Sequence, residues 1–275
     1  MRDRRRGQPA GAGSRGAARR GPIRPQLLVV NLGNSRTTLA RFSGDALESR
    51  VALTTRRRTT DECAFALSQA MAAELGQQPR AAVLCSVVPR LTGAWRRALE
   101  RFTGAAPVEA GPATAPLRIR YGDPATLGPD RIANAIAARE RHGAPAIVVD
   151  LGTATNFDCV SAEGEFVGGA IAPGIGLSAE ALAARAARLP RVTLEAPERA
   201  LATDTASALR VGIVWGAAAL VDGLVRRLAH EMGGRPRVIG TGGFARWLAP
   251  ECETMDVVDE DLTLHGLRIL WEANK

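Results

Sequence analysis

Two short stretches of the chain combine an apolar run, a glycine and small polar residues in an order that suits phosphate binding. "VVNLGNS" begins at Val29 and "VVDLGTATNFD" begins at Val148. A glycine at the end of a strand leaves backbone N–H groups unpaired at a tight bend, and Ser or Thr hydroxyls add further donors. An acidic residue just before that glycine could hold a cation against bound phosphates. One such stretch alone would be taken as a plain β-hairpin turn, but two of them facing each other could grip a triphosphate from both sides.

A third stretch, "YGDPATLGPDRIANA", groups a carboxylate, a guanidinium and a phenol hydroxyl in one loop. Asp130 follows Pro129 where a helical pattern begins, so its plainer role would be that of an N-cap or first-turn aspartate. Arg131 beside it and Tyr121 upstream would suit a small anionic substrate whose hydroxyl group needs a base. Asp130 is therefore a candidate general base.

The segments around these stretches alternate between strand and helix patterns. Short apolar runs predict strands at 26–30, 37–42, 81–88, 144–152, 165–174 and 237–243. Helical spacing of apolar residues predicts helices at 60–75, 91–102, 130–142, 177–187, 205–232 and 262–273. The two strand–turn–strand openings place Asn31 and Asp150 119 residues apart. This repeat predicts a duplicated α/β architecture, with halves at 26–145 and 146–275 after a disordered tail at 1–25.

Composition narrows the class of protein. The four cysteines form no C-x-x-C pair and the three histidines do not cluster with them, so neither a zinc site nor a disulfide framework is expected. No apolar run approaches the roughly 20 residues that span a bilayer, and the start of the chain has no signal-peptide pattern. We therefore expect a cytoplasmic protein without membrane contact.

The basic charge of the chain belongs almost entirely to its first 26 residues. They contain eight arginines and one aspartate, against a net charge of +8 for the whole chain. A segment built from Arg, Gly, Ala and Pro cannot bury enough apolar surface to order itself. It could contact RNA or anionic lipid, or it could have no role, and it lacks the interleaved aromatics of a nucleic-acid binder. Nucleic acid is therefore not expected as a partner except through this tail.

An ordered set of motifs resembles the type III pantothenate kinase family. The motifs, in chain order from residue 26 to 274, are "NLGNS", "CSVVP", "YGDPATLGPDRIANA", "DLGTATNFD", "GGAIAPGI", "TDTASALRVGIVWG", "IGTGG" and "DEDLTLHGL". The resemblance implies an actin-like (ribonuclease H-like) ATPase fold of two similar α/β halves with mixed sheets. It also implies ATP-dependent phosphorylation of pantothenate to 4′-phosphopantothenate, the first step of coenzyme A biosynthesis. Mg²⁺ with ATP, a monovalent cation (K⁺ or NH₄⁺) and a homodimer are further implications.

The resemblance assigns roles to individual residues of this sequence. It makes Asp130 the proton acceptor and Asp150 the ligand of the monovalent cation. The implied pantothenate contacts are Tyr121, Gly128, Pro129, Asp130, Arg131 and Thr205, with Thr205 completing the pocket of the neighbouring subunit. The implied ATP contacts are Asn31, Leu32, Gly33, Asn34, Ser35, Arg36, Thr37, Thr38 and Thr153.

The first turn departs from the family pattern, which is Asp-x-Gly-Asn-Thr. Ser35 keeps the hydroxyl of the usual threonine, but Asn31 replaces the usual aspartate with a neutral amide. Loss of a charge-assisted contact of this kind costs about 1.5–3 kcal/mol. The main hypothesis is an active pantothenate kinase, in which Asp158 is a candidate substitute carboxylate. The alternatives are a pseudokinase acting as a nucleotide-binding or transcription-accessory regulatory protein, and an actin-like kinase for another small hydroxy acid.

Overall fold

The computed structural model of the chain describes residues 26–75, 79–186 and 188–275, so the predicted tail at 1–25 lies outside the described residues. The strands are β1 (Gln26–Leu32), β2 (Arg36–Ser43), β3 (Ala46–Thr54), β4 (Ala81–Ser86), β5 (Val108–Glu109), β6 (Ala146–Leu151), β7 (Ala154–Val160), β8 (Phe166–Pro173), β9 (Arg237–Thr241) and β10 (Val257–Val258). The α-helices are α1 (Thr60–Ala70), α2 (Pro89–Thr103), α3 (Pro129–Ala137), α4 (Ile175–Arg185), α5 (Thr205–Arg210), α6 (Gly216–Met232), α7 (Ala245–Leu248) and α8 (Leu262–Glu272). Single π-helical turns extend α1 and α3 and join α5 to α6.

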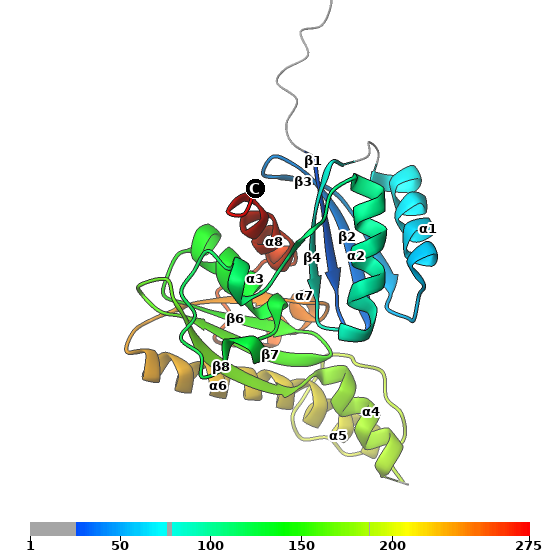
Figure 1. Cartoon of the computed structure of the whole chain (residues 1–275). Coiled ribbons are helices and arrows are strands. Elements are labelled where there is room, and N and C mark those ends of the chain that lie inside the picture. Colours follow the sequence, from blue (N-terminus) through cyan, green and yellow to red (C-terminus); the bar gives the residue numbers. More distant parts are fainter. Residues whose placement is uncertain (1–25, 76–78, 187) are drawn as a thin grey trace, which may run out of the picture.

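The strands form two five-stranded sheets that share one topology (Figure 1). The strand orders are β3-β2-β1-β4-β5 in the first sheet and β8-β7-β6-β9-β10 in the second. In each sheet the three strands of the opening meander are antiparallel, and the next two strands run parallel to the first. Asn31 and Asp150 are each the last residue but one of the equivalent strands β1 and β6. The predicted duplicated α/β fold with mixed sheets is therefore confirmed.

Alternate residues of the central strands face two different cores, because successive side chains of a strand point to opposite faces. In β1, Val30 packs in the outer core under α1 and α2, whereas Val29 packs in a central core that contains residues of both sheets. Asn31 has the parity of Val29 and so lies on the central face. In β6, Val148 belongs to the central core, and Asp150 follows it on that face. Asn31 and Asp150 therefore both lie on the sheet faces that line the central core between the two sheets.

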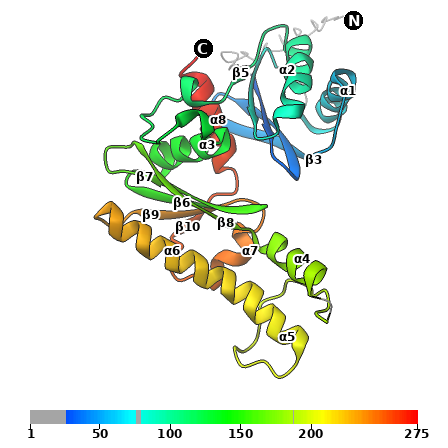
Figure 2. The ribbon, with the colours of Figure 1, turned by 60° about the horizontal axis from the view of Figure 1, so that its bottom comes forward.

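Helices α3 and α8 cross between the two sheets and fill the central core (Figures 1 and 2). Every residue of α3 from Arg131 to Ala137 is buried. The helices approach closely at Gly266 of α8, where an added Cβ would lie 1.9 Å from the carbonyl oxygen of Ala133. The sheets fall on either side of the predicted boundary at 145/146, but the chain's last helix packs in the core shared by both. The exact division into halves stays a prediction.

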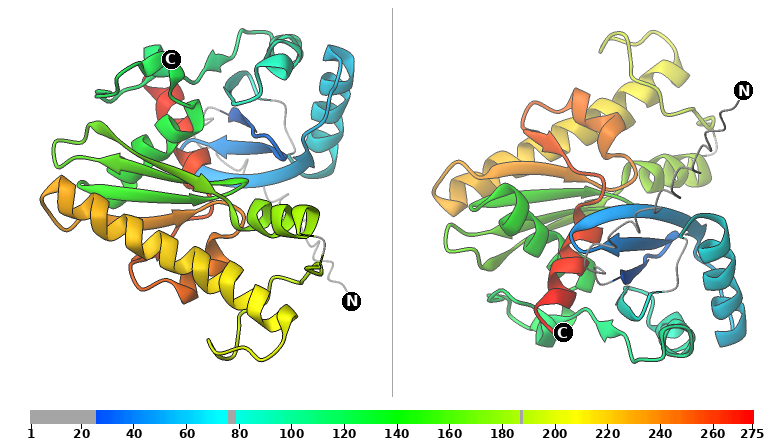
Figure 3. Two further views of the ribbon diagram at one scale, coloured as in Figure 1. Left: turned by 90° about the horizontal axis from the view of Figure 1, so that it is seen from below. Right: turned by 90° about the horizontal axis from the view of Figure 1, so that it is seen from above.

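The described part of the chain contains one helical segment, Thr205–Met232, that is long and apolar enough to cross a membrane by length and composition alone. In this fold the segment runs along the outer face of the second sheet (Figure 3). Val214, Val221 and Val225 are buried there against that sheet's outer core. Asp222 accepts hydrogen bonds from the backbone N–H groups of Glu253 and Thr254. These contacts are those of a helix packed on a globular core.

The sequence patterns located the long helices and most strands but missed β3, β5 and β10. β3 has no buried residue and alternates between exposed and half-buried positions, because it is the outermost strand of its sheet. The short strands β5 and β10 lie at the opposite edges. Edge strands bury little apolar surface and leave little pattern in the sequence. The helix predicted at 177–187 begins two residues earlier, at Ile175, and ends at Arg185.

Candidate active site

The two glycine turns, one from each sheet, meet each other. The Ser35 hydroxyl, after β1, and the Thr153 hydroxyl, after β6, lie 2.9 Å apart and share a hydrogen bond. Both turns are closed by a backbone hydrogen bond, from Gly33 N to Arg36 O in the first and from Gly152 N to Ala154 O in the second. The facing arrangement predicted from the repeat is thus what the structure contains.

The first turn is braced by Thr55, which the sequence interpretation did not single out. Its hydroxyl donates to the carbonyl oxygen of Gly33 at 2.8 Å and lies 2.8 Å from the hydroxyl of Thr37. Its backbone N–H donates to the carbonyl of Ser35 at 3.1 Å. Three contacts from the end of β3 therefore hold the shape of the turn. Leu32, Asn34 and Thr38 belong to the same β1–β2 hairpin, Leu32 buried, Asn34 exposed and Thr38 half-buried.

Asp130 lies in the first turn of α3, at the end of the helix that points into the site. Its carboxylate accepts a hydrogen bond from the backbone N–H of Arg131 at 2.9 Å. Burial raises the pKa of Asp130, while that N–H group and the Arg131 charge oppose the shift. Gly128 and Pro129 lead into the helix with Pro129 at its first position, where its fixed φ and missing N–H are tolerated. The location at a helix start, inferred from the sequence, is confirmed.

Arg131 is held by a buried ion pair. Its Nε donates to Asp158 Oδ1 at 2.6 Å, and its Nη2 donates to the carbonyl oxygen of Phe157 at 3.0 Å. The guanidinium carbon also lies 5.6 Å from the ring centroid of Phe166, on which Tyr121 packs edge-on at 6.0 Å. The structure therefore brings Tyr121 and Arg131 together, as the resemblance implied.

The carboxylate of Asp158 is committed to this ion pair, which the sequence did not reveal. Its side chain is fully buried, and Arg131 and Asn134 both donate to it. Burial raises the pKa of Asp158 to about 7, although Arg131 opposes the shift. Removing one partner of a buried pair leaves an uncompensated charge. The geometry thus argues against the idea that Asp158 replaces the missing carboxylate at position 31.

Asp150 points its two oxygens in different directions. Oδ2 accepts a hydrogen bond from Asn134 Nδ2 of α3 at 3.3 Å. Oδ1 faces the glycine turns, since a Cβ built on Gly242, whose φ is +91°, would lie 2.4 Å from it. Burial, and after it the charge of Asp130, raises the pKa of Asp150 to about 6. The two candidate acids are therefore close enough to influence each other's protonation.

The donor set around Asp150 fits a cation held together with bound phosphates. Among the described residues, no group of three or more His, Cys, Asp or Glu side chains is arranged to hold a metal ion. Mg²⁺ does not require such a cage, because it is usually bound through one or two carboxylates together with substrate phosphates. The half-buried Asp150 has one oxygen beside the glycine turns at Gly152 and Gly242, where it could hold a monovalent cation or, together with bound phosphates, Mg²⁺.

Thr205 is the one implied substrate contact that the fold keeps away from the others. It is exposed at the start of α5, where Asp204 caps the helix by accepting from Ser207 N at 2.9 Å. The segment carrying α4 and α5 projects from the second sheet, away from α3 (Figures 1 and 2). Within one chain, Thr205 therefore does not join Asp130 and Tyr121.

Comparison with known proteins agrees with this geometry. The family model described as type III pantothenate kinase matches residues 27–227. A type III pantothenate kinase of Acidothermus cellulolyticus is 47% identical over 258 residues, covering 90% of this chain and 98% of the relative. One from Geobacter sulfurreducens is 43% identical over 254 residues, covering 90% and 99%.

Solved structures share the fold at low sequence identity. A Campylobacter jejuni protein whose name places it in a Baf family of transcriptional activators superposes with a TM-score of 0.58 at 21% identity, covering 90% of this chain and 98% of that one. MreB 5 of Spiroplasma citri bound to AMPPNP gives a TM-score of 0.54 at 9% identity, covering 91% and 97%. These likenesses establish the actin-like ATPase fold alone. The family match and the full-length curated relatives go further, and by them this chain belongs to the type III pantothenate kinases.

Proposed function

We propose that this kinase, which phosphorylates pantothenate in coenzyme A biosynthesis, performs the transfer from ATP where the two glycine turns meet, with Asp130 as the base. The observation that carries the proposal is the meeting of the Ser35 and Thr153 hydroxyls at 2.9 Å. That contact brings both phosphate-type turns to one place, and Asp150 Oδ1 lies beside the second of them. A triphosphate bound there would be held by backbone N–H groups and hydroxyls of both halves.

Asp130 would accept the proton of the primary hydroxyl of pantothenate as the γ-phosphoryl group is transferred. A base must be ionised to accept a proton, and the buried position of Asp130 raises its pKa toward the range in which a base is effective. Arg131 and Tyr121 would orient the substrate, and the ion pair with Asp158 keeps the Arg131 guanidinium in place. Arg131 would meet the carboxylate of pantothenate with its remaining N–H groups.

Two cations complete the proposal. A divalent ion, which we take to be Mg²⁺, would bind together with ATP and offset the charge of its phosphates. A monovalent cation, K⁺ or NH₄⁺, would bind Asp150 through Oδ1, the oxygen that Asn134 leaves free.

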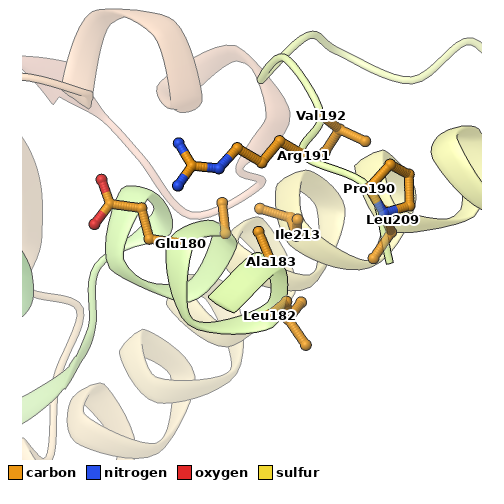
Figure 4. A pocket seen from close by; sticks show the side chains of 9 residues that line it. Glu180, Leu182, Ala183, Pro190, Arg191, Val192, Leu209 and Ile213 are labelled. Carbon is orange, nitrogen blue, oxygen red and sulfur yellow. The ribbon is translucent and has the colours of Figure 1, made fainter. Parts of the chain in front are cut away.

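Pantothenate recognition would be shared between two subunits. Thr205 stands on a projecting segment with several exposed leucines, of which Leu201 is 82%, Leu177 48% and Leu182 41% accessible. The same segment carries a cavity of about 180 Å³ between α4 and α5, where Arg191 and Glu180 extend toward each other at the edge (Figure 4). An exposed apolar surface of this kind marks an interface. We assign it to a second copy of the chain, in a cytoplasmic homodimer.

A coupled ADP-release assay with purified protein tests the proposal. ADP release should require pantothenate and a divalent ion and should increase with K⁺ or NH₄⁺. Light scattering at the assay concentration should give the mass of a dimer. ADP release that is independent of pantothenate would contradict the assigned substrate site. A protein that binds ATP without releasing ADP would favour the alternative of a regulatory pseudokinase, which rests on the neutral amide of Asn31.

A further inference from the structure

The motif "DEDLTLHGL" at the start of α8 has no role in the proposed chemistry, yet it reaches the active site through one side chain. The Thr263 hydroxyl donates to Asn134 Oδ1 at 2.7 Å, linking residues 129 positions apart. Asn134 is fully buried on α3. Its amide nitrogen lies 3.3 Å from Asp150 Oδ2 and 3.4 Å from Asp158 Oδ2. Thr263, Asn134 and Asp150 thus form a chain of hydrogen bonds that ends at the proposed cation ligand.

We propose that Thr263 and Asn134 are positioning residues, which fix the carboxylate of Asp150 so that Oδ1 is presented to the monovalent cation. An ionised carboxylate only accepts hydrogen bonds, so the NH₂ group of Asn134 must face the two aspartates. Its carbonyl oxygen then points away from them into buried surroundings, where an unpaired acceptor is unfavourable. Thr263 supplies the donor that satisfies it. The hydroxyl therefore sets the orientation of the amide, and the amide sets that of Asp150.

The geometry of Asp150 supports this division of roles between its two oxygens. The oxygen facing α3, Oδ2, is occupied by Asn134. The other, Oδ1, lies beside the turns at Gly152 and Gly242, since Cβ atoms built there would lie 3.6 and 2.4 Å from it. A rotation of the carboxylate by less than a half-turn would move its oxygen away from Asn134, whereas a half-turn exchanges two equivalent oxygens and restores the same arrangement. A fixed Asn134 therefore keeps one oxygen directed at the phosphate turns.

The start of α8, and with it Thr263, is held by ion pairs from two places in the first half of the chain. Just before α8, Asp261 pairs with Arg50 of β3 in the first sheet. Asp259 accepts from His142 at 3.0 Å and from Arg141 at 3.2 Å, at the end of the π-helical turn after α3. The start of α8 is thereby tied to the first sheet and to the end of the α3 segment. Thr263 thus transmits the placement of the two halves to the Asp150 side chain.

The test is Thr263→Val, which removes the hydroxyl while keeping a β-branched side chain of similar size. The inference rests on the proposed role of Asp150, so K⁺ binding is measured directly, as the rise in Tm with added KCl against choline chloride. We expect the K⁺ concentration for half-maximal stabilisation and for half-maximal activation to rise about tenfold in Thr263→Val. The KM for pantothenate should stay within twofold, and Thr263→Ser should restore the parent values to within twofold.

Two further variants separate a specific effect on K⁺ binding from a general loss of stability. Thr103→Val removes a hydroxyl that donates to Leu99 O on α2, away from the site, and should leave the K⁺ response unchanged. Asp150→Asn should abolish it. A K⁺ response that is lost in Asp150→Asn but intact in Thr263→Val would overturn the positioning role alone. A parent protein with no K⁺-dependent rise in Tm would overturn both the positioning role and the cation role of Asp150. A lower Tm in Thr263→Val with unchanged K⁺ dependence would reduce Thr263 to a structural residue.

Discussion

The charged residues of the site divide into those that are neutralised by the protein and those left for ligands. Asp158 is neutralised by Arg131 within a buried pair. Asp130 and Asp150 have no cationic partner within ion-pair distance among the described residues, and burial raises the pKa of each. Holding two such acids near each other costs stability in the free protein. That cost is offset when cations and a phosphoryl donor bind, which is the arrangement expected of a phosphotransferase.

The first prediction concerns Asp130 as the base. Asp130→Asn keeps the size of the side chain but removes its ability to accept a proton. Turnover should fall by about two to four decades, the usual contribution of general-base catalysis. Pantothenate binding, measured by calorimetry in the presence of a non-hydrolysable ATP analogue, should change little. Turnover within a few-fold of the parent would refute the assignment.

The pH dependence of the reaction follows from the raised pKa of Asp130. The ionised form is active, so kcat/KM for pantothenate should fall as the pH decreases through that pKa. Because burial raises the pKa, the acid limb should lie above the usual aspartate value of 3.8. The limb is measured at saturating ATP, after correction for the titration of both substrates. An acid limb at or below the ordinary aspartate range would contradict the burial argument.

Asn31 is predicted to weaken metal handling and to leave substrate recognition intact. It lies on the central face of β1, where its register partners are Thr38 of β2 and Cys85 of β4. Asn31→Asp should lower the Mg²⁺ or ATP requirement or raise turnover, by up to one to two decades for a restored charge-assisted contact of about 1.5–3 kcal/mol. The KM for pantothenate should change little.

A matched control for Asn31→Asp places the same charge in the exposed part of the same turn. Asn34→Asp adds a carboxylate three residues further on, where the side chain is exposed. It should give no gain in turnover or in metal affinity. An equal gain from both variants would mean that added charge, and not a carboxylate at position 31, is responsible. No gain from Asn31→Asp in an active enzyme would contradict the predicted metal role.

At the scale of elements, the sequence predicted what depends on local pattern and missed what depends on packing between elements. The glycine turns and the Asp130–Arg131 pair are contiguous, so their spacing could be interpreted directly. The network of Asn134, Asp158 and Thr263 joins α3, β7 and α8, and nothing local links them. Arg131 and Asn134 do share one face of a helix at i, i+3 spacing. Their carboxylate partner Asp158 can be identified only from the strand register, which places it opposite Val148 on the central face.

The crossing of α3 and α8 gives a prediction about stability. Gly266→Ala would place a Cβ 1.9 Å from the Ala133 carbonyl oxygen, so the helices must separate. Overpacking of a core typically costs about 1–3 kcal/mol, and the loss should be measurable by urea unfolding. Because α3 carries Asp130 and Asn134, turnover should fall as well.

The control for this crossing is another helical glycine. At Gly93 of α2, an added Cβ would meet only the end of the Arg97 side chain, at 3.4 Å. Gly93→Ala should therefore be neutral or stabilising by up to about 1 kcal/mol, the difference in helix propensity. Equal effects of the two substitutions would contradict the idea that α3 and α8 need a glycine at their contact.

At the scale of the whole molecule, the two halves share a topology but have diverged in function. The first contributes a phosphate turn without a carboxylate, and the second contributes Asp150 and an additional projecting segment with α4 and α5. That segment carries Thr205 and much of the exposed apolar surface. One chain therefore holds both parts of the proposed pantothenate pocket, but at separate places. We expect that Thr205 of a second copy of the chain completes each pocket.

Complementation between two inactive variants tests that arrangement. If Thr205 serves the neighbouring subunit, a mixed dimer of Asp130→Asn and Thr205→Arg contains one doubly altered site and one site with both native residues. Each variant alone should be nearly inactive, the second because a bulky cation replaces a small hydroxyl at the pocket edge. When equal amounts of the two variants exchange subunits at random, half of the dimers are mixed. Each mixed dimer has one native site out of two. The activity should therefore recover to about a quarter of the parent value. Light scattering verifies that both variants remain dimers. Activity that stays at the sum of the two variants after verified exchange would mean that Thr205 acts within its own chain, and the distance between α5 and α3 would then require a rearrangement of the projecting segment.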